Sequence, residues 1–443
     1  MSSLLNLSSP GQLAGAGPVA EETEYRALVC LFFAGGNDSF NMLAPYGDAE
    51  HQDYLTRRGF AGLAKEQLLE LDYDGPSQTR YGVHEKLPFL KSEFDASRLA
   101  FVANTGTLVR PIASVEEFES GILPVPRGLF SHSDQTRSWQ SSLPDIDAPK
   151  TGWGGRLADI LDSANQAGNL PMNISVGGGN LFQTGQGNHT YVISPGGPVQ
   201  LGDFYNDHWK KRRQAVEALL ENEYENLFKK TYRNQKQQAI ETQLTYQTAL
   251  LDSEQITVPF SADNLLSSQF QQVARTIAAR DELGVCRQTF YVQLGGFDTH
   301  ADLLVTQASL LEKVNQAMEE FVTAIQELGL ENQVTIFNAS DFARTLTPNG
   351  AGSDHGWGGN YFVWGGGVQG KKIYGEYPAI VEDNPLDTGR GQMIPTTSTD
   401  EYFAELALWM GATKAQLPDL FPNLEHFHDV EGNDPPLGFM DLG

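Results

Sequence analysis

The chain has 443 residues, of which 40% are hydrophobic and 19% charged, as in a globular protein with room for a large core. Its formal net charge of -26 argues against nucleic acid or an anionic membrane surface as partner, because both bind cationic faces. No apolar run of about 18 residues is present, so we expect no transmembrane segment.

The first residues differ from the rest of the chain. Residues 1–20 are small, uncharged and mildly apolar, and Ala14-Gly15-Ala16 resembles a signal-peptidase cleavage site, but the positive n-region of an export signal is missing. Two interpretations stay open for residues 1–24: the remainder of a signal peptide, or a disordered terminus.

The first expected strand ends at an acidic turn. Residues 28–34 are an unbroken apolar run, typical of a strand buried on both faces of a parallel sheet. Gly35-Gly36 ends the run, and Asp38 follows at its carboxyl end. Ligands bind at this edge of open α/β sheets.

The sequence of the middle of the chain predicts both helices and strands. We expect an exposed helix at 65–71, a strand at 98–103, and a helix after Ser131, which stands at its N-cap. The remaining elements expected up to residue 283 are a helix at 152–161, short strands within 171–198, long helices between 208 and 251, and a helix at 264–283.

Two later strands repeat the first pattern. The strand at 289–294 leads through Gly295-Gly296 to Asp298 and His300, and the strand at 334–338 leads to Asp341. A helical repeat between them, ending at Gly329, predicts a right-handed βαβ crossover. A capping box at Ser398 begins a helix that ends at Gly411.

These elements predict an α/β fold with a mostly parallel central sheet. We expect one domain over 25–430 with a helical insertion at about 200–260, followed by a tail at 431–443. Cys30 and Cys286 fall in expected strands, and their residue type favours two buried thiols over a disulfide.

Acidic residues and histidines are candidates for a metal site. Asp38, Asp298, His300, Asp341 and His355 carry the side chains that hold Zn²⁺ or Mn²⁺. Five such groups exceed the usual ligand set of one ion, so two ions about 4 Å apart would fit. Each Asp could instead cap a helix or form a turn.

The residue that would attack a substrate is left open by the sequence. Ser131, at a helix N-terminus, is one candidate, and the rivals are Ser39, Thr105 and Thr107. His132 could assist or simply pack. Arg344 could bind a substrate oxyanion, although a structural ion pair is the commoner role for such an arginine.

Five segments resemble a known bacterial family, domain of unknown function 1501: GGNDSFN (35–41), LGGFDTHAD (294–302), SDFART (340–345), SDHGWGG (353–359) and IPTTSTDEY (394–402). The resemblance covers about residues 26–425. It implies an alkaline phosphatase-like three-layer sandwich in the alkaline phosphatase and sulfatase superfamily, and export by a twin-arginine signal to the periplasm or cell exterior.

The resemblance also implies roles for individual residues. Asp38 and Asp341 would bind one metal ion, Asp298, His300 and His355 would bind the other, and Ser131 would be the nucleophile between them. The chain departs from the superfamily at Phe342, where an imidazole ligand is usual, and at His300, which follows Asp298 by two residues rather than four. It also lacks the cysteine of sulfatases that use formylglycine.

Two functions remain in view. The first is an exported metal-dependent hydrolase of phosphate or sulfate esters, acting on a small-molecule, glycan or lipid ester. The second, favoured by Phe342, is a catalytically inactive periplasmic or cell-surface binding protein on the same scaffold. The sequence gives no oligomeric state.

Overall fold

A computed structural model describes residues 24–73, 79–165, 170–198, 207–253 and 255–442. Its strands are β1 (Arg26–Ala34), β2 (Leu43–Pro45), β3 (Leu68–Glu70), β4 (Tyr81–His84), β5 (Leu99–Gly106), β6 (Asn173–Ser175), β7 (Tyr191–Val192), β8 (Arg287–Gly295), β9 (Val334–Ser340), β10 (Gly359–Gly365), β11 (Ile373–Tyr374) and β12 (Thr397–Ser398). Its α-helices are α1 (Ser39–Met42), α2 (Asp48–Arg58), α3 (Pro88–Asp95), α4 (Val115–Glu119), α5 (His132–Ser141), α6 (Trp153–Leu161), α7 (Lys210–Glu221), α8 (Leu227–Asp252), α9 (Leu265–Ala278), α10 (Arg280–Leu283), α11 (Leu303–Glu327), α12 (Thr399–Met410) and α13 (Leu417–Leu420).

One large sheet organises the chain. Its strand order is β11-β5-β10-β9-β1-β8-β6-β7, and β12 lies beside β5. Among the strand pairs of this sheet that the structure describes, only those of β10 with β5 and β9 are antiparallel. The expectation of a mostly parallel α/β sheet is confirmed.

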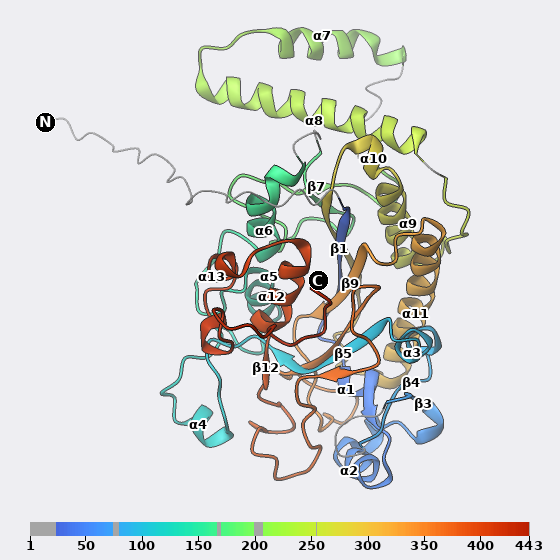
Figure 1. The fold of residues 1–443 in the computed structure, drawn as a ribbon, viewed down its shortest axis with the longest axis vertical. Helices are drawn as coiled ribbons and strands as arrows, with labels where there is room; N and C mark the ends of the chain where they lie inside the picture. The colour runs from blue at the N-terminus through green and yellow to red at the C-terminus, as the bar shows by residue number, and fades with distance from the viewer. Residues whose placement is uncertain (1–23, 74–78, 166–169, 199–206, 254, 443) are drawn as a thin grey trace, which may run out of the picture.

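Both faces of the sheet are covered. Along β1, Ala27, Val29, Leu31 and Phe33 pack into one core, whereas Leu28, Cys30 and Phe32 pack into the other. The first core is shared with α9 and α11, and the second with α5, α6 and α12 (Figure 1). This alternation of buried residues on both faces produces the three-layer sandwich.

The three acid-bearing strands are neighbours. β1 pairs in parallel with β8 on one side and with β9 on the other, so that Phe33 lies opposite both Leu294 and Ser340. Strands β8 and β9, which α11 connects, are therefore not neighbours, because β1 lies between them. Because the three strands are parallel, the loops that carry Asp38, Asp298 and Asp341 leave the sheet at the same edge.

One expected helix was wrong, and two helix ends are confirmed. In place of a helix at 65–71, a 3₁₀ turn at Lys65–Gln67 leads into β3, which pairs with β4 in a separate three-stranded sheet and buries Leu68. Tertiary pairing decides the outcome for this short segment. The capping box of Ser398 and the left-handed Gly411 are present at the ends of α12.

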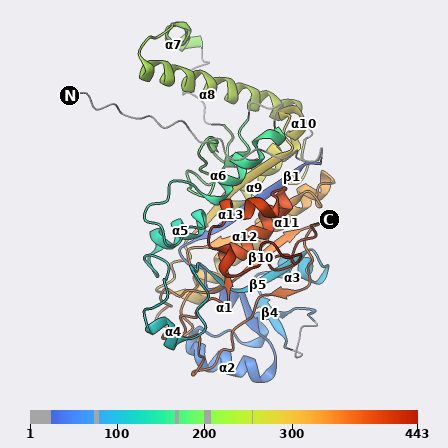
Figure 2. The ribbon, with the colours of Figure 1, turned by 60° about the vertical axis from the view of Figure 1, so that its left-hand side comes forward.

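Helices α7 and α8 form an arm that stands away from the sandwich (Figures 1 and 2). They fall within the insertion expected at 200–260. The C-terminal half of α8 is attached to the body, because Tyr246, Ala249 and Leu250 are buried in the first core. The leader-like residues 1–23 lie outside the described residues.

A buried carboxylate fixes the end of the chain. Glu405 of α12 is fully buried, and its carboxylate accepts the backbone N–H groups of Leu437, Gly438 and Met440 at 2.6–2.8 Å. Both cysteines are free thiols. No helix among the described residues is long and apolar enough to cross a lipid bilayer.

Candidate metal centre

Close contact between loops sets the geometry at the carboxyl edge. Gly35 has a φ of 120°, and a Cβ on it would lie 2.4 Å from the backbone nitrogen of Asp298. Gly36 has a φ of 82°, and a Cβ there would lie 2.5 Å from the Phe342 ring. The paired glycines therefore let the loop after β1 touch the loops after β8 and β9.

Asp298 lies at the centre of a cluster of nitrogen atoms. Its Oδ1 atom is 3.0 Å from Nε2 of His300, 3.5 Å from Nε2 of His132 and 3.6 Å from Nε2 of His355. Nη1 of Arg344 donates to the same oxygen at 3.0 Å. Three loops and the first turn of α5 thus bring three imidazoles and a guanidinium to one carboxylate.

Each histidine is oriented by an oxygen acceptor at its other ring nitrogen. Nδ1 of His132 is 2.6 Å from Oδ2 of Asp341, Nδ1 of His355 is 2.7 Å from the carbonyl oxygen of Phe130, and Nδ1 of His300 is 3.2 Å from Oδ1 of Asp354. Because these oxygens accept, we assign the proton to Nδ1 in each neutral ring. The Nε2 lone pairs then face the centre of the cluster, as in histidines that ligate metals.

Three features of this donor set fit a cation. Nε2 of His132 is buried and has no hydrogen-bond partner. Nε2 of His300 lies 3.1 Å from Nε2 of His355, where two lone pairs repel unless a proton or a cation stands between them. Ligand atoms of His132, Asp298 and His355 all lie within 4.8 Å of one another. Tetrahedral Zn²⁺ sites, with bonds of about 2.0–2.2 Å, place neighbouring ligand atoms roughly 3.4 Å apart.

The charges in the cluster shift its pKa values. Burial raises the pKa of Asp298, but Arg344, His300 and His132 outweigh burial and hold it below its ordinary value. Burial lowers the pKa of His355, so its neutral, ligating form is favoured. Burial also raises the pKa of Asp341, against the opposing effect of His132.

Asp38 has a different partner. Its Oδ2 is paired with Nη2 of Arg58, and both side chains are at most 1% exposed. Nη1 of Arg58 also donates to the carbonyl oxygens of Thr345 (2.9 Å) and Leu346 (3.2 Å). The contacts of Asp38 therefore join β1 to α2 and, through Arg58, to the loop that carries Arg344.

Arg344 and the candidate nucleophiles have well-defined partners or are buried. Arg344 is fully buried, donates to Asp298 and, through Nε, to Oγ of Ser353 at 3.3 Å. Ser131 stands at the N-cap of α5 without capping a backbone N–H, and its Oγ donates instead to Oδ2 of Asp134 at 2.7 Å. Ser39, Thr105 and Thr107, the rivals of Ser131, are all at most 4% exposed.

Phe342 forms an apolar wall of the cluster. Its ring centroid lies 4.8 Å from that of His132 and 4.6 Å from that of His355. The side chain thus packs against two imidazoles at the position where the resemblance leads us to look for a third ligand.

Sequence reasoning missed two contributors. It left the role of His132 open and did not consider Asp354, which accepts from His300 and pairs with Arg390. Both could have been found from their neighbours in the sequence. His132 is the first residue of α5 and directly follows the candidate Ser131, and Asp354 directly precedes the candidate His355. The strained backbone of Phe130, with a φ of 73°, places the carbonyl that orients His355 and has no signature in the sequence.

Residues 25–389 match the family described as "Protein of unknown function (DUF1501)". The chain belongs to this family. No curated protein matches this DUF1501 chain.

Solved structures resemble the DUF1501 chain at low identity. Ps i-CgsB is 9% identical with a TM-score of 0.37, covering 90% of this chain and 77% of its own. The soluble domain of lipooligosaccharide phosphoethanolamine transferase A from Neisseria meningitidis is 11% identical with a TM-score of 0.36, covering 87% and 88%. The PsFucS1 sulfatase from Pseudoalteromonas sp. is 8% identical with a TM-score of 0.34, covering 88% and 68%. At these scores the structures carry no inference about the chemistry of this chain.

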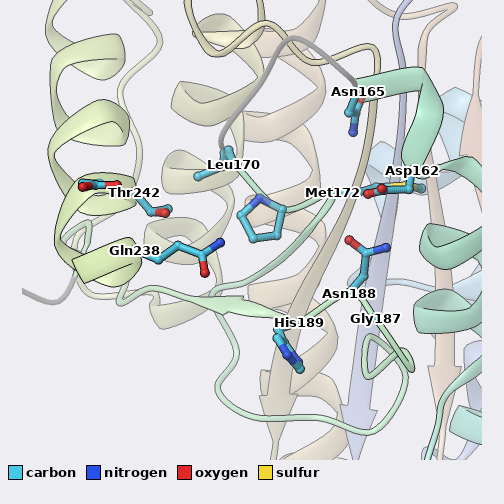
Figure 3. Close-up of a pocket in the computed structure, with 11 residues that line it drawn as sticks. Asp162, Asn165, Leu170, Met172, Gly187, Asn188, His189, Gln238 and Thr242 are labelled. Carbon is cyan, nitrogen blue, oxygen red and sulfur yellow. The ribbon is translucent and has the colours of Figure 1, made fainter. Parts of the chain in front are cut away.

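A separate cavity of about 450 Å³ lies at the opposite edge of the sheet. It is lined by Met172, which precedes β6, by Asn188 and His189, which precede β7, and by Gln238 and Thr242 of α8 (Figure 3). Its residues come before the strands rather than after them, so it is distinct from the candidate metal centre.

Proposed function

We propose that the protein is an exported, metal-dependent hydrolase of phosphate or sulfate esters. The observation that carries the proposal is the buried, unpartnered Nε2 atom of His132, which faces the carboxylate and the other two imidazoles of the cluster. Trp139 and Trp153 also leave a buried ring nitrogen without a partner in the apolar core, so what distinguishes Nε2 of His132 is its place beside a carboxylate and a second imidazole whose ligand atoms lie within 4.8 Å of one another.

His132, Asp298, His300 and His355 would hold one divalent ion, and an imidazole-rich set favours Zn²⁺ over Mn²⁺. A bound ion of this kind acts as a Lewis acid toward a substrate oxygen. One ion fits better than two, because Arg58 pairs with Asp38 and His132 with Asp341. Those two carboxylates were the ligands expected for the second ion.

Cations near the cluster suit an anionic ester. The chain carries a net charge of -26, so a phosphate or sulfate group needs local positive charge to approach. Arg390, whose side chain is 50% exposed, supplies it beside Asp354, whereas Arg344 is fully buried and paired with Asp298. An ester of a glycan or a lipid would satisfy the same chemistry.

Ser131 is the nucleophile of the proposed reaction. Its Oγ–H already donates to Asp134, so that carboxylate can take the proton as Oγ attacks the phosphorus or sulfur atom. The alcohol oxygen of the ester then leaves with its electron pair, and water hydrolyses the serine ester. His132 directly follows Ser131 in the chain, so the attacking residue is adjacent in sequence to a residue of the cluster.

A second candidate function is supported by a specific observation. Asp38 is held by Arg58, and Phe342 fills the place of an imidazole, so the chain has fewer free ligands than a two-ion hydrolase needs. A binding protein that retains one ion without turnover fits these contacts as well.

Metal analysis and a substrate screen separate the two functions. We expect the purified protein to contain close to one equivalent of a divalent ion and to cleave at least one of an aryl phosphate, a bis-aryl phosphate and an aryl sulfate. Bound metal without turnover would favour the binding protein, and protein that binds no ion would overturn the hydrolase and leave only the binding protein. His132→Ala should lose the ion, whereas His189→Ala, the matched control in the distant cavity, should keep it.

Export is a separate part of the proposal, supported by the composition of residues 1–20. Cell fractionation of the native host tests it. Recovery of the protein in the periplasm or medium is expected, and recovery only in the cytoplasm would contradict it.

A further inference from the structure

Another cavity, of about 460 Å³, lies at the same edge of the sheet as the candidate metal centre. Among the residues that line it, Leu108 follows β5, Glu376 follows β11, and Thr396 directly precedes β12. Strands β5 and β9 are both antiparallel to β10, so the chain leaves them at one edge. Ligands bind at this edge of open α/β sheets, and cavities of roughly 300–1,000 Å³ hold small molecules.

The walls of this cavity are largely apolar. Leu108 and Ile112 belong to a small hydrophobic cluster with Trp357, and Leu386 and Phe427 pack against that cluster. All but Trp357 line the cavity. Aliphatic and aromatic side chains cannot replace the hydrogen bonds of a hydrated ion, so a ligand that fits these walls needs an apolar body.

The charged groups of the cavity are both acidic. Glu376 and Glu401 line it, and neither forms an ion pair within the part of the chain that the structure describes. Oε2 of Glu401 accepts the N–H and the Oγ–H of Ser398, both at 2.8 Å, which leaves Oε1 for a ligand. Burial raises the pKa of Glu401, as expected of a carboxylate that has no cation beside it.

An organic cation fits this cavity better than a metal ion does. Among the described residues, three close metal-ligand atoms occur together only in the candidate metal centre, so Glu376, Glu401 and His426 do not converge on one point. The face of an aromatic ring such as Phe427 also attracts an ammonium group. The net charge of -26 draws cations toward the protein and repels anions.

We propose that the cavity binds a small organic ammonium ion. Its positive charge lies beside the carboxylates of Glu376 and Glu401, and its apolar body lies against Leu108, Ile112 and Phe427. This site goes beyond the proposed hydrolase function, because none of the residues named here belongs to the metal cluster. Binding is therefore independent of the metal ion.

Titration calorimetry of the full-length protein with benzyltrimethylammonium tests the proposal. In about 0.1 M salt, which screens the long-range attraction of the acidic surface, we expect one saturable site with a Kd of about 1 mM or tighter. Benzyl alcohol and benzoate, which carry the same ring without the positive charge, should bind at least tenfold more weakly. Equal affinity for benzyl alcohol, or no saturable binding of the cation, would overturn the proposal.

Single variants locate the bound cation. Glu401→Gln should weaken binding at least tenfold with an unchanged melting temperature, because glutamine can replace glutamate in the capping box with Ser398. Glu376→Gln, at an exposed position that the fold does not depend on, should weaken it less. Phe427→Leu keeps an apolar wall without the aromatic face and should cost about three- to tenfold in affinity.

The matched control makes the same change in the cavity at the opposite edge of the sheet. Glu241→Gln removes one negative charge there and should leave the Kd unchanged. An equal loss of affinity in Glu241→Gln would show attraction to the acidic surface as a whole and would overturn the assignment. A parental Kd in both Glu401→Gln and Glu376→Gln would overturn it as well.

Discussion

Nδ1 of His132 and Oδ2 of Asp341 lie 2.6 Å apart, although 209 positions separate the two residues in the chain. The carboxylate fixes the tautomer in which Nε2 of His132 is free to bind a cation. Asp341 thus orients the imidazole of His132.

This contact predicts a graded effect for Asp341→Asn. The amide keeps the shape of the carboxylate but lowers the basicity of His132, so metal affinity should fall by about 10- to 100-fold rather than vanish. Competition with a chelator measures the change, with Asp298→Asn as the variant that should lose the ion altogether. Complete loss of metal in Asp341→Asn would instead indicate direct ligation by Asp341.

Asp38 and Arg58 predict a stability effect with little effect on metal. Asp38→Ala leaves the buried guanidinium of Arg58 without its counter-charge and should lower the free energy of unfolding by about 3–5 kcal/mol. Urea unfolding measures this loss. The double change Asp38→Leu with Arg58→Met should recover part of it, and metal content should stay unchanged in both. Loss of the ion from folded Asp38→Ala would restore Asp38 as a ligand.

Ser131→Ala separates chemistry from metal binding. If Ser131 attacks the substrate, the variant should lose turnover by at least a hundredfold while its metal content matches that of the parent protein. Asp134→Asn should reduce turnover less severely, because it removes only the proton acceptor. Full activity in Ser131→Ala would rule out this nucleophile.

Asp400 predicts a pH dependence of stability. Burial raises its pKa from 3.8 to about 7 in the folded protein, so between these pH values the folded state holds a proton that the unfolded state has released. Its contribution, at most about 4 kcal/mol, is therefore fully present below pH 4 and is lost as pH rises through 7. Asp400→Asn should remove this slope and unfold at a higher temperature than the parent at pH 8. An unchanged pH profile in the variant would contradict the assignment.

The sequence predicted the parts of the fold that depend on local pattern. Continuous apolar runs identified β1, β8 and β9, and their acidic turns were correctly placed at one edge of the sheet. The helix expected at 65–71 was wrong, because pairing with β4 outweighs the local preference of a short segment.

The candidate site was less predictable than the fold. Asp298, His300 and His355 were named from the sequence, and the structure brings them together. The partners of Asp38 and Asp341 were not predictable, because Arg58 and His132 are distant in sequence and reach them only through tertiary packing. Whether these residues bind metal stays a prediction.

The hydrogen bonds from the backbone of Leu437, Gly438 and Met440 to the Glu405 carboxylate have a practical consequence for truncation. The segment shared with the family stops at residue 389, before α12 begins. A fragment trimmed to that boundary would lose the helix that seals one side of the sandwich and would expose Phe32 and Trp153, which pack in the same core. Expression of residues 25–389 alone is thus expected to yield aggregates. A fusion partner attached directly after Met440 would strain the hydrogen bonds between Glu405 and the last residues.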